Sequence, residues 1–211
     1  MPSSSYCLSA YAAGTLPEAF NLVVASHISI CDDARARLES LEVLGGALLE
    51  ACEPVEMSYG SFEATMRLIS ERPKEPIKAS IRRECDVLPA PLAGYVGGDI
   101  GAVKWTPIGM GARQSILKTE GSANVRLLHI PAGSELPDHG HHGTELTLVL
   151  KGAFIDGEER FARGDLEIAG EDLEHTPIAD VGEDCICLAA SDAKLKFSGL
   201  LPRLAQPFLR I

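Results

Sequence analysis

The chain has 211 residues, with 19 Lys+Arg against 30 Asp+Glu, a formal net charge of −11 and an isoelectric point near 5.0. Residues 1–90 carry 8 basic and 13 acidic side chains and residues 91–211 carry 11 and 17, so neither half offers the basic surface that direct binding of nucleic acid requires. A protein partner with a basic surface is the more natural inference. The length is sufficient for one large domain or two small ones with a substantial core.

The N-terminus and the cysteine content indicate the compartment. No signal peptide opens the chain, because Met1 to Ser5 is polar, and no apolar run approaches the ~18 residues of a membrane span. The cysteines are too sparse for a disulfide scaffold in a chain of this length. They are Cys7, Cys31, Cys52, Cys85, Cys185 and Cys187. We therefore expect a cytoplasmic protein with reduced thiols and no membrane contact.

Residues 1–72 have the apolar spacing of short helices. The pattern predicts helices over 6–13, from 18 through His27, from Asp32 to before Pro54, and over 61–70. The third of these has an apolar stripe made of Ala34, Leu38, Leu41, Leu44 and Leu48. Short helices bury little apolar area by themselves, so we expect them to need a metal, a partner or a second domain.

Residues 73–97 are predicted to be a linker. Several prolines, glycines towards the end and the lack of a sustained period favour an irregular connection. Four residues of this segment are nevertheless apolar enough to pack across a following domain: Ile81, Val87, Leu88 and Leu92.

From residue 98 the period changes from helical to two. The short runs RQSILK, NVRLLHI, TELTLVL, LEIA and DCICLAA alternate between turn signals, which predicts many short strands in an antiparallel sandwich or barrel. The expected fold class is therefore α+β and multidomain. We expect a small N-terminal helical bundle over 1–72, a linker over 73–97 and an antiparallel β-sandwich or barrel over 98–211.

One stretch, from Gly133 to Gly152, carries the chemistry. His139 and His141 are two residues apart, so both imidazoles leave an extended strand by the same face, and Glu145 keeps that parity. These three side chains and the distant His175 form a candidate set of four ligands for a divalent metal. Imidazole and carboxylate donors favour zinc and also suit iron, manganese or nickel.

The spacing of this stretch resembles the first motif of the cupin family. In that motif a glycine is followed by five residues, His-x-His, three or four residues, Glu, six residues and a second glycine, and every gap is matched here. A second cupin motif begins at Gly164 and ends in the fourth ligand, His175, although Gly170 stands where the family usually has proline. The resemblance implies a β-barrel with a metal held by His139, His141, Glu145 and His175.

The N-terminal helices resemble the zinc-binding anti-sigma domain. That family places His, three residues, Cys, two residues, Cys, and here His27 and Cys31 fit while Ala34 occupies the second cysteine position. The family also uses a histidine at the extreme N-terminus, which residues 1–6 lack. We therefore expect His27 and Cys31 to be a capping or core pair, with Cys7 or Asp33 as the alternative additional ligands of a second zinc.

A helical anti-sigma-like domain followed by a cupin resembles ChrR-type anti-sigma factors. The resemblance rests on YAAGTL, PDHGH, ELTLVLKGAF, LEHTP, DCICLAA and LPRLAQPFLRI. It implies a transcription regulator whose helices sequester an alternative sigma factor and whose cupin domain responds to oxidative stress, with no catalytic residues. The alternatives are a metal-dependent cupin dioxygenase and a small-molecule-binding cupin, which leave the helical segment without a role.

Cys185 and Cys187 are two apart on a predicted strand and so share one face. They are either core residues, as cysteine commonly is, or a thiol pair whose oxidation loosens the barrel. Same-face neighbours on one strand have poor geometry for a mutual disulfide, which favours sulfenic acid as the oxidised form.

Overall fold

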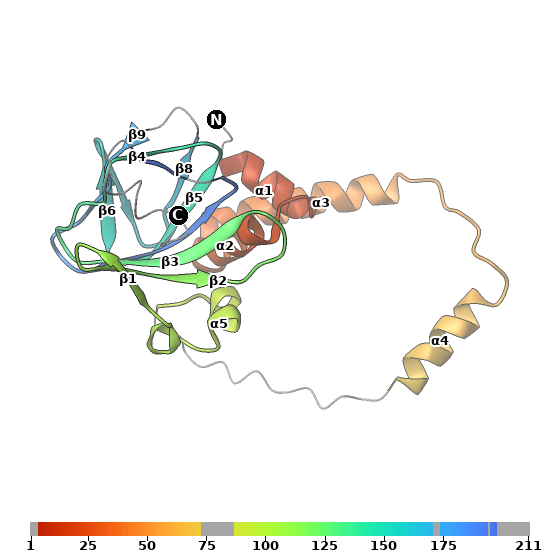
Figure 1. Ribbon diagram of the computed structural model, residues 1–211. Helices are drawn as coiled ribbons and strands as arrows, with labels where there is room; N and C mark the ends of the chain where they lie inside the picture. Colours follow the sequence, from red (N-terminus) through yellow and green to blue (C-terminus); the bar gives the residue numbers. More distant parts are fainter. Residues whose placement is uncertain (1–3, 73–86, 171–173, 194, 198–211) are drawn as a thin grey trace.

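The computed structural model describes residues 4–72, 87–170, 174–193 and 195–197, and in them a helical segment precedes a β domain (Figure 1). The four predicted helices are present, each within a few residues of its expected bounds. The helices are α1 (Ser4–Ala12), α2 (Glu18–Ile30), α3 (Asp32–Glu50), α4 (Ser61–Glu71) and α5 (Ala90–Val96), followed by the short 3₁₀ turn η1 (Ile100–Ala102). None of these helices combines the length and apolarity needed to cross a bilayer.

The β domain is antiparallel, as the period-two pattern predicts. Its strands are β1 (Thr106–Gly109), β2 (Ala112–Leu117), β3 (Asn124–Ile130), β4 (His139–His141), β5 (Glu145–Lys151), β6 (Ala153–Asp156), β7 (Glu159–Ala162), β8 (Leu166–Ala169), β9 (Glu174–His175), β10 (Ile178–Ala179), β11 (Cys185–Ser191) and β12 (Leu195–Phe197). They form a large sheet in the order β1-β2-β3-β11-β5-β8 and two small sheets, β10-β6-β7 and β12-β4-β9.

Both faces of the large sheet are buried at its centre. Along β5 the residues at even positions, such as Leu146 and Leu148, belong to one apolar cluster, whereas Val149 belongs to another. The same division separates Leu188 from Cys187 on β11. Since successive side chains of a strand point to opposite faces, one cluster lies outside the barrel and the other inside it.

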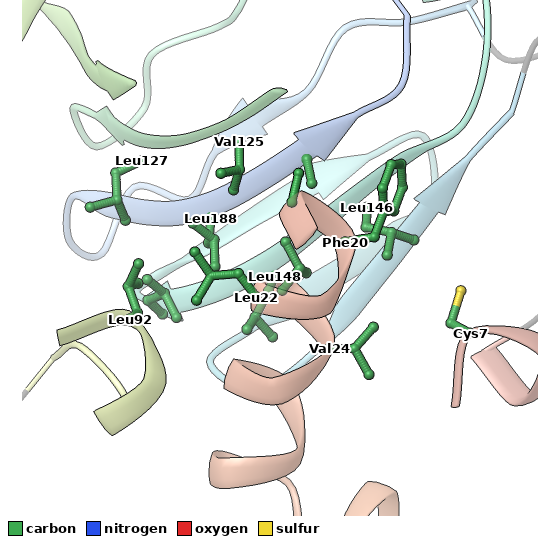
Figure 2. Packing of buried hydrophobic residues seen from close by; sticks show 14 of the residues in the cluster. Cys7, Phe20, Leu22, Val24, Leu92, Val125, Leu127, Leu146, Leu148 and Leu188 are labelled. Atoms are coloured by element: carbon green, nitrogen blue, oxygen red, sulfur yellow. The ribbon is translucent and has the colours of Figure 1, made fainter. Parts of the chain in front are cut away.

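Helix α2 packs on the outer face of the large sheet, and α1 and α5 pack beside it in the same apolar cluster. Phe20 and Leu22 of α2 lie against Leu146 and Leu148 of β5, whereas Val24 lies on the side of α2 towards Cys7 of α1 (Figure 2). The short helices thus bury their apolar side chains on the β domain, which supplies the surface that they lack by themselves.

A polar contact also holds α2 in place. The Glu18 carboxylate, in the first turn of α2, accepts hydrogen bonds from the Tyr95 hydroxyl of α5 at 2.5 Å and from the backbone N–H of Glu120, between β2 and β3.

The prediction of a linker over 73–97 is corrected in its last part. Residues 90–96 form α5, and Leu88 and Leu92 are fully buried in the core that the helices share with the sheet. Proline at the start of a helix and glycine after its end are compatible with this, because Pro91 lies in the first turn and Gly97 caps the end at φ 82°. Ile81 and the rest of 73–86 lie outside the described residues.

Helix α3 differs from its predicted stripe. Ala34 is buried and Leu41 half-buried, but Leu44 and Leu48 in the second half are 57% and 63% exposed. In Figure 1, α3 extends away from the barrel, and α4 stands apart from it. Helix α4 has no buried residue. A regular apolar period is therefore present in α3 and α4 without a covering surface among the described residues.

Replacing Phe20 by alanine is expected to destabilise the whole molecule by roughly 3–5 kcal/mol, because the ring is 6% exposed and packs in the shared core. Phe62→Ala on α4 is the matched control, since that ring is 70% exposed and its loss should cost less than about 0.5 kcal/mol. Denaturant unfolding followed by circular dichroism and by Trp105 fluorescence measures both. Unfolding of the helices well before the sheet in the wild type would contradict a shared core.

Candidate metal centre

Strand pairing brings His139 and His175 together inside the barrel. β4 pairs with β9 so that His139 lies opposite His175, and both residues are only 7% exposed. Their Nε2 atoms are 3.2 Å apart and their ring centroids 4.6 Å apart. Two imidazoles from distant parts of the sequence thus converge through the same ring nitrogen.

The other nitrogen of each ring is already engaged. His139 Nδ1 lies 2.9 Å from the Pro137 carbonyl, which only accepts, so Nδ1 carries the proton. His175 Nδ1 lies 2.9 Å from the Asp156 carboxylate and donates to it in the same way. The lone pairs of the two Nε2 atoms then point at one shared position. This is the orientation that metal-binding histidines take, with an acceptor fixing the tautomer from behind.

Burial supports the same protonation state. It lowers the pKa of His139, and the His175 ring adds to this effect, while the Pro137 carbonyl opposes it. A neutral imidazole is the form that binds a metal, so this ring is ready to coordinate at neutral pH.

Glu145 is the first residue of β5, and its carboxyl group is buried. Burial of its carboxyl group raises its pKa to about 7, against the attraction of the Arg126 guanidinium and a 3.3 Å hydrogen bond from the Thr147 hydroxyl. Its charge also acts on Glu167. Of His141 the structure describes the backbone, in β4 opposite Leu195. The parity of β4 therefore remains the argument for His141 as a ligand.

Asp156 and Glu167 are two further carboxylates that the sequence analysis did not single out. One ligand atom from each, together with one from His175, lies within 4.8 Å of the other two. Burial and, after it, the charge of Asp156 raise the pKa of Glu167 to about 8. The sequence feature that could have indicated Glu167 is its position between two apolar residues of the strand LEIA. Leu166 and Ile168 pack on the outer cluster, so Glu167 must face inward.

The donor set fits a divalent cation. Two imidazole nitrogens and nearby carboxylates gather in a space where burial disfavours negative charge, and a bound cation would remove that penalty. Nitrogen and oxygen donors of this kind suit zinc and other first-row metals.

The alternative of a second zinc site around His27 is not assembled among the described residues. His27 is 7% exposed, and its Nδ1 has no hydrogen-bond partner among the described residues. Burial lowers its pKa, opposed by a hydrogen bond to the backbone of Gly164 and by the charge of Asp165. Cys31 joins α2 to α3 and donates its N–H to the His27 carbonyl at 2.9 Å. In the described ranges, no third and fourth ligand meet this pair.

Cys185 and Cys187 lie inside the barrel, not on its helix-covered face. Their sulfur atoms are 3.4 Å apart and fully buried, beside Ile130, Val149 and Phe154. The hydrogen bond between the two thiols and their burial raise the pKa of Cys187 well above its usual value. Cys187 is therefore a protonated thiol at neutral pH, a state of low nucleophilicity.

The fold and the site together define a class of protein: a cupin barrel with an inward-facing candidate metal centre, carrying an N-terminal helical segment on the outer face of its main sheet. Comparison with known proteins identifies the family. Residues 95–194 match the ChrR cupin-like domain. Over 208 residues the chain is 54% identical to the anti-sigma-E factor ChrR of Cereibacter sphaeroides, covering 99% of this chain and 97% of that protein. The chain therefore belongs to the ChrR family.

A solved structure agrees with this assignment. The crystal structure of Rhodobacter sphaeroides SigE in complex with the anti-sigma ChrR matches with a TM-score of 0.78 at 51% identity, covering 90% of this chain and 97% of that one. The match extends over the helices as well as the cupin domain, so both halves of the fold class expected from the sequence are confirmed.

Proposed function

We propose that this protein is a cytoplasmic anti-sigma factor that sequesters an alternative sigma factor through its N-terminal helices and releases it when the cupin domain registers oxidative stress. The observation that carries the proposal is an uncovered apolar surface in the part of the chain expected to bind the partner. The family assignment supplies the partner's class, because the related ChrR was crystallised in complex with SigE. Residues 1–72 are the proposed sigma-binding part and 98–211 the proposed sensing part.

We call this surface the apolar arm. It consists of Val43, Leu44, Leu48 and Leu49 of α3 and Phe62, Met66, Leu68 and Ile69 of α4, which are 45% to 74% exposed. Exposed apolar groups that recur on neighbouring helices mark protein interaction sites, because a soluble monomer rarely leaves such a patch in water. The helix-in-groove mode of recognition uses this spacing of anchors.

The charge of the same region fits the proposed partner. Acidic residues flank the apolar arm, among them Glu42, Glu50 and Glu63, and all are exposed. A sigma factor presents basic surfaces to nucleic acid and polymerase, so an acidic partner would be steered towards it. Burial of the apolar anchors then provides the affinity.

The proposed cofactor is one zinc ion held by His139, His141, Glu145 and His175, with iron, manganese or nickel as the alternatives. Asp156 supports His175 from behind through its 2.9 Å contact with Nδ1. When bound, the metal would supply the positive charge that balances the buried carboxylates. Its loss would leave these groups crowded on β4, β5 and β9, which is the proposed origin of the signal.

The test uses transcription from a promoter of the cognate sigma factor, measured before and after an oxidative challenge. The wild-type protein should repress transcription and release it on challenge. Glu145→Ala leaves the apolar arm untouched, so it should still repress. Its induction should fall at least severalfold, because the variant lacks a buried carboxylate that metal loss would leave without a balancing charge. Equal induction in both proteins would place the sensor elsewhere. Failure of the purified wild-type protein to bind the sigma factor, with metal-dependent oxygen consumption instead, would favour a dioxygenase.

A further inference from the structure

The turn between β7 and β8 joins the barrel to two other parts of the chain. Nη1 of Arg163, in this turn, donates to the carbonyl of Leu150 at the end of β5 and, at 3.1 Å, to the carbonyl of Val87. A single guanidinium nitrogen thus bridges the main sheet and the residues that lead into α5. Such charge-assisted hydrogen bonds are stronger than neutral ones.

Val87 and Leu88 are held from the opposite side as well. The carboxylate of Asp99 accepts from the N–H of Leu88 at 2.8 Å and from that of Val87 at 3.4 Å. The side chain of Leu88 is 1% exposed in the shared core. Val87 is also the first described residue after α4 and the segment that follows it. Hydrogen bonds from Arg163 and to Asp99 therefore hold Val87 and Leu88, which follow the apolar arm in the chain, on the barrel.

The same turn abuts the end of α2. Gly164 has a φ of +94°, and a Cβ built there would lie 3.9 Å from the carbonyl oxygen of Ile30, the last residue of α2. The backbone of Gly164 also hydrogen-bonds the buried His27. Since α3 begins at Asp32, the turn lies beside the residues that lead into α3 as well as beside Val87, which follows the apolar arm in the chain.

On its other side the turn leads directly into the metal centre. Asp165 precedes β8, and Glu167 of β8 is one of the two carboxylates that converge with His175. Backbone hydrogen bonds of 2.9 Å from Gly164 N–H to the Val149 carbonyl and 3.1 Å from Val149 N–H to the Asp165 carbonyl hold the turn on β5. The turn is thus tied to β5 as well as continuous with β8. Because β5 and β8 are paired, a shift of these two strands would move the turn with them.

We infer that the β7–β8 turn, with Arg163 as its positioning residue, couples the state of the metal centre to both ends of the apolar arm. The inference rests on the proposed function for its biological meaning, but the coupling is a property of the chain alone. In the metal-bound state Arg163 holds Val87 and the turn holds the end of α2. When β8 shifts on metal loss, both contacts weaken together. Two sites communicate when both bias one element with two arrangements, and the turn is that element.

Hydrogen exchange of the full-length protein, loaded with zinc or treated with a chelator, tests the coupling. In the wild type, chelation should raise exchange at least threefold over 24–31 and 87–96 as well as around β8. In Arg163→Ala, exchange over 24–31 and 87–96 should already be raised with zinc bound, and chelation should change it less than twofold further. Peptides around β8 should respond to chelation in both proteins.

Arg160→Ala is the matched control, because Arg160 on β7 pairs with Asp180 at 2.8 Å and neither residue is part of the turn. It should behave as the wild type. Arg163→Lys keeps a cationic donor, so it keeps the test possible if the alanine variant does not fold. With zinc bound, this variant should raise exchange over 87–96 at least twofold. Equal responses of the wild type and both Arg163 variants would overturn the inference, as would a wild type whose helices do not respond to chelation.

Binding of the cognate sigma factor, measured on the same samples, distinguishes failure of the coupling from failure of the proposed function. Loss of the exchange response with sigma binding intact would overturn the coupling alone. A zinc-loaded wild type that shows the exchange response but binds no sigma factor would overturn the proposed function and leave the coupling supported.

Discussion

Replacing Leu44 and Leu48 together by glutamine is expected to weaken binding of the cognate sigma factor by about a hundredfold, because two interface anchors contribute roughly 1.4 kcal/mol each. Both side chains are more than half exposed and lie one turn apart on the same face of α3. Glutamine favours helix and carries no charge, so the helix and the net charge of the arm are preserved. Titration calorimetry or surface plasmon resonance measures the change.

The control for this prediction is Val181→Gln. Val181 is 83% exposed on the barrel and lies outside the apolar arm, so its loss should leave sigma binding unchanged. Thermal unfolding of both variants should stay close to that of the wild type, since exposed substitutions alter stability by less than about 0.5 kcal/mol each. Unchanged affinity in the Leu44/Leu48 variant would show that the sigma factor binds another surface.

The second large effect concerns metal content. His141→Ala and His139→Ala should each reduce bound zinc from one ion per chain to a trace, because a four-ligand site loses an essential donor. Asp156→Asn should retain the metal but weaken its affinity about 10–100-fold, as substitution of a group that orients a histidine ligand does. Elemental analysis gives the stoichiometry, and competition with a chelating dye gives the affinity.

His27→Ala serves as the comparison in the same experiment and should still hold one metal per chain. Two metals per wild-type chain, one of them lost in His27→Ala, would establish the N-terminal zinc site that the geometry around His27 does not support. Full occupancy in His141→Ala would end the assignment of the cupin ligands.

The arrangement of the shared core changes how a signal can travel. If the helices and the cupin were joined only by a linker, the chain itself would be the sole route between them. Instead Phe20 and Leu22 pack on the outer face of the sheet whose inner face borders the candidate metal centre. Because β5 and β11 are shared by both faces, a shift inside the barrel reaches α2 through one layer of backbone.

The sequence by itself was sufficient for the local features. The period of two located β2, β3, β5, β8 and β11, since strand parity is a property of neighbouring residues. The proximity of His139 and His175 is not a local feature. It was expected from the resemblance to the cupin motifs, and their Nε2 atoms lie 3.2 Å apart. The apolar spacing in residues 1–72 likewise predicted helices α1 to α4.

Only the tertiary structure decided which surfaces these periods cover. The apolar stripe of α3 has the same spacing whether it packs within the chain or remains exposed, and here Ala34 is buried while Leu44 and Leu48 are not. Residues 90–96 are too few for a helical period to be recognised, and burial of Leu92 against the sheet stabilises α5. Asp156 and Glu167 reach His175 because β6, β8 and β9 converge, and such long-range strand contacts leave no local pattern in the sequence.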